Sequence, residues 1–165
     1  MANELTRIKR YKRRYIICVL IMLVISSVIL NFIFFYAYEP AKCKEKTMHT
    51  YVANIDVLNS ISDFMKNNDF KSMYIDLDEI DKGILTRDPY KGNVYIPINP
   101  EIKMLIDESQ CKSVSKRGNS IYYLVEIWMS TGHGLAYSLD GDKPDSVFIE
   151  ETEHLGDNWY YYKSK

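Results

Sequence analysis

The chain has 165 residues, of which 47% are hydrophobic and 26% are charged, and its formal net charge is −1. The charge is unevenly divided, because residues 39–165 hold 15 of the 21 basic and 21 of the 22 acidic residues, a net charge of −6. Such an acidic segment argues against nucleic acid, and against an anionic lipid surface held by charge, as partners. Its length is that of one ordinary domain.

Residues 16–36 form an apolar run of 21 positions without a charge. As a helix this run is ~31 Å long, which matches a hydrocarbon core of ~30 Å. The sequence therefore predicts a single transmembrane helix over 15–38, in contact with membrane lipid. The residues expected to contact lipid along this helix, from its start to its end, include Ile16, Leu23, Leu30 and Tyr36.

The flanks of this run predict its orientation. Six of residues 1–14 are Lys or Arg and one is acidic, a net charge of +5, whereas the stretch beyond the run mixes both signs. The positive-inside rule places the N-terminal segment in the cytoplasm and residues 39–165 outside the cell membrane. The apolar run exceeds the ~7–15 residues of a signal peptide, and no pair of small residues suited to cleavage follows it. We therefore expect an uncleaved anchor.

The middle of the chain predicts a linker, two helices and short strands. Residues 39–47 are charged and contain a proline, which favours a linker. Apolar side chains then recur every three or four positions from 48 to 65, the period of an amphipathic helix. Residues 73–77 alternate like a strand, and 94–96 favour a second short one. Asn99 followed by Pro100 is typical of a helix start.

The last third of the chain predicts consecutive strands joined by turns. The turn residues are Gly118-Asn119 and Asp140-Gly141, which accept positive φ angles. Helices followed by hairpin-linked strands indicate an α+β domain over 48–165, with about two helices packed on a mainly antiparallel sheet. The predicted strands are 112–116, 120–129, 135–139, 147–150 and 158–163.

His133 is the most reactive candidate, because Gly132 and Gly134 predict an exposed turn around it. A catalytic role would pair it with Ser130 or with a carboxylate such as Glu126 or Asp142, but the chain shows no nucleophile-elbow pattern. A surface histidine is the favoured interpretation.

No cofactor or metal site is predicted. Asp140, Asp142 and Asp145 lack the spacing of an EF-hand loop. Cys43 and Cys111 lie too far apart in the sequence to suggest a metal site, and they remain open to either a disulfide or two separate thiols.

Aromatic residues mark the candidate binding surface, since ten of the 14 tyrosines lie in residues 39–165. On a strand, successive side chains point to opposite faces, so one face of each aromatic strand packs on the helices and the other faces solvent or a partner. Tyr and Trp are enriched at protein interfaces, although cross-strand tyrosines also stabilise sheets. The candidate binding residues are Tyr122, Tyr123, His133, Tyr137, Trp159 and Tyr161.

The segments GHGLAYSLDG (132–141) and GDNWYYYK (156–163) resemble short segments of uncharacterised small membrane-anchored proteins of low-GC Gram-positive bacteria. That group has no established activity, so the resemblance implies no catalytic residue. The layout of one span and an acidic outer domain is also that of some membrane-anchored immunity proteins, which shield cells from toxins arriving from outside.

These observations predict a membrane-anchored, extracytoplasmic protein-binding module, with immunity against a secreted toxin as its specific form. Two alternatives stay open. One is an envelope hydrolase that uses His133, and the other is a small accessory subunit that contacts a membrane complex through the span near Asn31.

Overall fold

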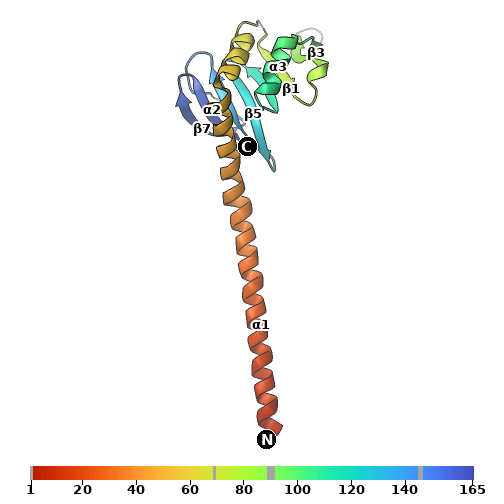
Figure 1. The fold of residues 1–165 in the computed structure, drawn as a ribbon, viewed down its shortest axis with the longest axis vertical. Helices are drawn as coiled ribbons and strands as arrows, with labels where there is room; N and C mark the ends of the chain where they lie inside the picture. The colour runs from red at the N-terminus through yellow and green to blue at the C-terminus, as the bar shows by residue number, and fades with distance from the viewer. Residues whose placement is uncertain (1, 69, 89–91, 145–146) are drawn as a thin grey trace. The chain divides into compact units, whose positions relative to one another are not determined.

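The computed structural model describes residues 2–68, 70–88, 92–144 and 147–165, which form two compact units, Met1–Ala41 and Lys42–Lys165 (Figure 1). The first unit is helical, with α1 at Ala2–Ile33 followed by the π-helix η1 at Phe34–Tyr38. By length and composition, the helical stretch from Lys12 onward can cross a membrane. A single N-terminal span and a signal sequence both meet this criterion.

Two polar side chains in the apolar stretch form hydrogen bonds inside their own helix. The Ser26 hydroxyl donates to the Leu23 carbonyl at 2.9 Å, and the Asn31 amide donates to the Ser27 carbonyl at 2.8 Å. Polar groups in lipid require such internal partners. The stretch therefore carries Ser26 and Asn31 at little cost.

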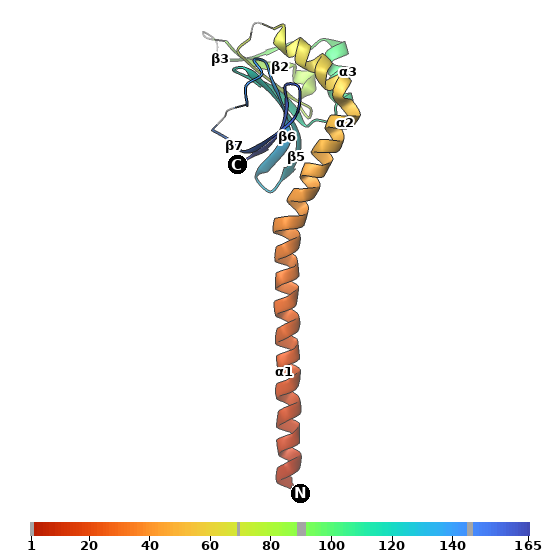
Figure 2. The same ribbon diagram turned by 90° about the vertical axis from the view of Figure 1, so that its left-hand side faces the viewer.

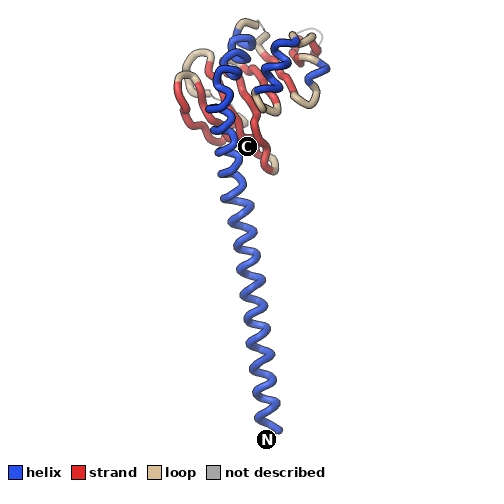
Figure 3. Tube along the Cα trace, in the orientation of Figure 1, coloured by secondary structure: helices blue, strands red, loops and turns tan. Residues whose placement is uncertain are grey.

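The second unit is an α+β domain, as predicted, with helices preceding most of an antiparallel sheet (Figure 3). Its helices are α2 (Glu39–Lys66, of which residues 42–66 belong to this unit), the 3-10 helix η2 (Ile80–Lys82) and α3 (Pro100–Glu108). Its strands are β1 (Ser72–Asp76), β2 (Ile84–Asp88), β3 (Gly92–Ile96), β4 (Ser113–Arg117), β5 (Ser120–Trp128), β6 (Thr131–Ser138), β7 (Ile149–Gly156) and β8 (Trp159–Ser164). They pair in the order β3-β2-β1-β4-β5-β6-β8-β7.

Three local predictions differ from the structure. Residues 39–47, expected as a linker, are helical and belong to α2, which follows η1 without a break, so Pro40 lies directly after the π-helix in a continuous helical stretch. Strand β2 was not predicted, because its sequence ILTRD lacks strict alternation. His133 lies within strand β6 and not on a turn.

Helices α2 and α3 lie on one face of the sheet (Figure 2). Asn99 caps α3 as predicted, with its side chain accepting from the Glu101 amide at 2.9 Å. The core between helices and sheet is fully buried; its largest aliphatic members are Leu58, Ile61, Met65, Met73, Ile75, Ile84, Ile106, Ile121 and Leu135.

The C-terminal end of α2 is held by a buried lysine from the sheet. The Lys116 ammonium donates to the carbonyls of Met65 and Asn68, at 2.8 and 2.7 Å. Carbonyls in the last turn of a helix lack backbone partners, and a cation there also complements the helix dipole. Lys116 therefore fixes the point at which α2 ends on β4.

Candidate functional site

Most of the aromatic residues singled out from the sequence lie between α2 and the sheet. Trp159 is 2% exposed, and its indole N–H donates to the Asn59 side chain of α2 at 3.1 Å. Its ring centroid lies 5.4 Å from that of Tyr123 and 5.1 Å from that of Tyr137. These rings form the core contact between α2 and the strands, with Tyr123 and Trp159 buried and Tyr137 half-buried.

Tyr123 shows how closely this contact is fitted. Its hydroxyl lies 2.6 Å from the Ser62 hydroxyl and donates to the Leu58 carbonyl at 3.1 Å. Complete burial raises the pKa of Tyr123 far above its usual range, because the phenolate would have no solvation there. Tyr123 therefore acts as a neutral hydrogen-bonding anchor for α2.

His133 is buried, which corrects the expectation of an exposed turn residue. His133 is 1% exposed, and its Nδ1 shares a hydrogen bond of 2.7 Å with the Tyr161 hydroxyl. Tyr161 is also 1% exposed. Burial, and then the charge of Lys163, lower the pKa of His133, so the neutral imidazole is favoured.

The neighbouring Gly134 has a packing role and does not provide the flexibility that a turn would need. A Cβ at this position would lie 2.1 Å from the Tyr123 carbonyl oxygen and under 3 Å from the Tyr162 ring. The Gly-His-Gly sequence that suggested an exposed turn is explained by this close approach inside the sheet.

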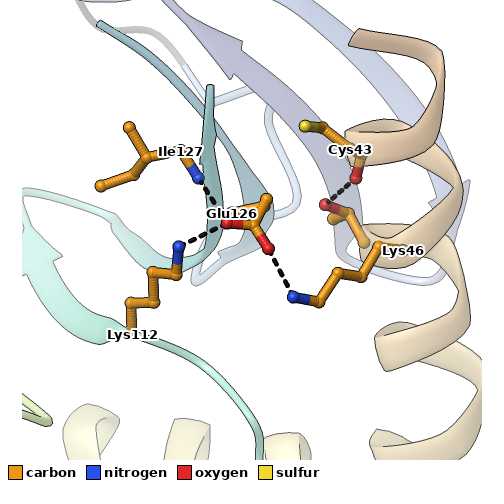
Figure 4. A network of polar contacts seen from close by, with 6 residues as sticks. Cys43, Lys46, Lys112, Glu126 and Ile127 are labelled. Carbon is orange, nitrogen blue, oxygen red and sulfur yellow. Dashed lines mark hydrogen bonds and ion pairs between the residues drawn. The ribbon is translucent and has the colours of Figure 1, made fainter. Parts of the chain in front are cut away.

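Glu126 lies opposite His133 on the adjacent strand, yet its carboxylate is engaged elsewhere. It accepts from Lys46 of α2, from Lys112 just before β4, and from the Ile127 amide at 3.2 Å (Figure 4). These donors outweigh partial burial and lower the pKa of Glu126 to about 2. The carboxylate therefore stays ionised and ties the first turns of α2 to the sheet.

The other face of the sheet carries no helix among the described residues (Figure 2). There, Tyr122 of β5 packs edge-on against Tyr162 of β8 and against Phe148, with ring centroids 5.6 Å apart in both pairs. Ala136 completes this second buried cluster. The alternation predicted for the aromatic strands is thus confirmed, with Tyr122, Tyr160 and Tyr162 opposite to the helices.

Two adjoining hollows lie in this helix-free face, and we call them together the open groove. Their volumes are about 360 and 410 Å³, and they share Tyr74, Ser113 and Leu124. The first is also lined by Ser115, Arg117, Tyr122, Phe148, Tyr162 and Ser164, among others. The second extends along Asp76, Leu77, Asp78, Lys112 and Ile127.

The open groove combines hydroxyls, aromatic edges and charge. Ser115 pairs across the strands with Tyr74 on one side and Tyr122 on the other, so three hydroxyl-bearing residues form one row. The exposed Arg117 places its guanidinium 4.8 Å from the centre of the Phe148 ring. Such a lining offers both hydrogen bonds and apolar contact to a bound group.

Sequence reasoning identified Tyr122 in this groove but missed the β4 residues. Ser113, Ser115 and Arg117 alternate with the core residues Val114 and Lys116. Two small side chains on one face of β4, Ser113 and Ser115, are the signal that could have marked a hollow there, although both are buried.

The remaining candidate groups form no reactive centre among the described residues. Cys43 and Cys111 form no disulfide, and burial raises the pKa of the Cys111 thiol to about 11. Asp140 accepts hydrogen bonds from Asn119, Ser138 and the Asp142 amide, as a turn residue does. Asp145 lies outside the described residues, and no group of three or more His, Cys, Asp or Glu within them is arranged to hold a metal ion.

Comparison of the chain with protein-family models, with curated proteins and with solved structures finds no match.

Proposed function

We propose that the chain is a membrane-anchored binding module that offers the open groove to a protein partner outside the cytoplasmic membrane. The observation that carries the proposal is the groove itself: it is hollow, lies on the sheet face opposite to α2 and α3, and is lined by tyrosines, serines and the exposed Arg117. Aromatic and arginine side chains at a hollow are the groups that dominate protein interfaces.

The membrane part of the proposal is supported by the apolar helical stretch and its flanks. The net charge of +5 on residues 1–14 favours a cytoplasmic N-terminus, which would place the α+β domain on the outer side. An acidic domain in that position meets secreted proteins, of which basic ones are attracted by its net charge of −6.

The hydrolase alternative receives less support from the geometry. A general base must reach its substrate, whereas His133 is 1% exposed and hydrogen-bonded to Tyr161. Glu126 is engaged by two lysines. We therefore favour binding over catalysis.

The proposal is tested with the full-length protein in detergent or nanodiscs as bait for envelope and secreted fractions, read by mass spectrometry. Two variants alter the groove: Arg117→Ala removes its exposed cation, and Ser115→Trp fills its floor. Lys103→Ala is the matched control, because Lys103 lies on α3, on the opposite face. We expect one protein to be enriched by the wild type and by the control, and to be lost with both groove variants.

Retention of that partner by both groove variants, with far-UV circular dichroism and thermal melts like those of the wild type, would contradict the proposal. The immunity form of the proposal makes a separate prediction. Deletion of the gene should sensitise cells to a toxin from neighbouring cells, and the Arg117→Ala variant should fail to restore protection. Unchanged survival in such competition would exclude the immunity form while leaving the binding test intact.

A further inference from the structure

The tip of the β5–β6 hairpin carries apolar side chains that the domain does not bury. Trp128 of β5 pairs with Thr131 of β6, which leaves Met129 and Ser130 as a two-residue turn. Ile127 is 47% exposed and Met129 is 71% exposed, with the half-buried Trp128 between them. Ile127 also lines the second hollow of the open groove, whereas Trp128 and Met129 line neither hollow.

The conformation of Met129 is unusual for its residue type. Its φ is +55°, in the left-handed region that Asn and Gly adopt readily in two-residue hairpin turns and Met rarely adopts. The turn would form more easily with either of those residues. Met129 therefore occupies this turn position at a cost in conformational free energy.

The tip lies at the end of the domain where α2 begins. Glu126, three residues before Met129, accepts a hydrogen bond from Lys46 of α2. Lys46 follows Tyr38 by eight residues, a rise of ~12 Å along a helix. The headgroup layer that borders the hydrocarbon core is itself ~5–8 Å thick. By chain length alone, the tip is therefore within reach of a bilayer that the apolar stretch crosses.

We propose that Trp128 and Met129 insert into the interfacial layer of the membrane that anchors the protein. Trp is the side chain that favours this layer most clearly, because it pairs a large apolar ring with an N–H donor. The contact does not require anionic lipid, since the domain is acidic overall and the tip is apolar. Lys46 and Lys112 compensate the charge of Glu126 near the tip.

The proposal rests on the membrane span of the proposed function but not on the partner in the open groove. Its test uses the full chain reconstituted in zwitterionic phosphatidylcholine vesicles whose acyl chains carry bromine, a contact quencher of tryptophan. The chain has two tryptophans, and Trp159 is buried in the core. The difference between the wild type and Trp128→Phe therefore reports Trp128 alone.

We expect brominated lipid to quench the Trp128 emission and vesicle insertion to protect it from aqueous acrylamide. Met129→Asn suits the turn conformation better, so it should preserve or raise stability while reducing the lipid quenching of Trp128. Equal acrylamide quenching of Trp128 in vesicles and in detergent, with no effect of brominated lipid, would overturn the proposal. Failure of the chain to float with vesicles would instead refute the span, which distinguishes the two inferences.

Discussion

Replacing Glu126 by Gln tests whether its carboxylate holds the first turns of α2 on the sheet. The fall of its pKa from 4.5 to about 2 corresponds to at most ~3.4 kcal/mol of stabilisation. The side chains of Lys46 and Lys112 are 56% and 46% exposed, so solvent screens both ion pairs. We therefore expect Glu126→Gln to lower the free energy of unfolding by about 1–2 kcal/mol at pH 7.

The pH dependence of this difference has a definite sign. Because the folded protein holds the Glu126 pKa below that of the unfolded chain, the stabilisation is complete above about pH 4.5 and is lost as the pH falls toward 2. Urea unfolding of the full-length protein in mild detergent measures the difference at pH 7, 5 and 3, followed by the emission of Trp159 in variants that also carry Trp128→Phe. Glu150→Gln is the control, since its exposed carboxylate pairs with a single lysine and should change stability far less. A Glu126→Gln difference that is absent at pH 7, or equal at pH 7 and 3, would refute the assignment.

Three further predictions concern the core. Trp159→Ala should cost about 3–5 kcal/mol in urea unfolding followed by circular dichroism, because it removes the indole packed between α2 and the sheet; a loss below ~1 kcal/mol would contradict that packing. Gly134→Ala should destabilise far more than Gly118→Ala in thermal melts, since only the first places its Cβ against a carbonyl oxygen, and equal losses would exclude that close approach. Cys111 should react with iodoacetamide at least ~100-fold more slowly in the folded than in the unfolded protein, because a pKa of about 11 leaves little thiolate at pH 7; comparable rates would show the thiol to be exposed.

The elements with strong local signals could be predicted from the sequence. The apolar period of three to four residues placed the helix that ends at Lys66, and Asn99-Pro100 placed the start of α3. The antiparallel sheet followed from alternating strands separated by turn residues such as Gly118, whose φ is +56°. These features depend on neighbours in the sequence, so local patterns are enough to identify them.

The candidate site depended on contacts between distant segments, which local patterns do not contain. Alternation predicts that Trp159 and Tyr160 face opposite ways, but it does not say which side α2 covers. Asn59 is separated by 100 residues from the Trp159 ring that it binds, and this contact decides the question. The Gly-His-Gly sequence likewise has two explanations. Its glycines could form a flexible turn, or they could leave room for close packing inside a sheet, and the position of the Tyr162 ring beside Gly134 distinguishes the two.

Strand β7 forms one edge of the sheet, and its composition matters under the proposed anchoring, which would confine the protein to a membrane plane. Copies held in two dimensions meet often, and an unpaired strand edge can add a strand from a neighbour. The exposed Glu150, Glu151 and Glu153 lie along this edge, with Lys44 and Lys163 as their partners. A strand from another copy that paired with β7 would have to desolvate these charged side chains. Under the proposed anchoring, this edge would allow copies to pack densely without the sheets joining into aggregates.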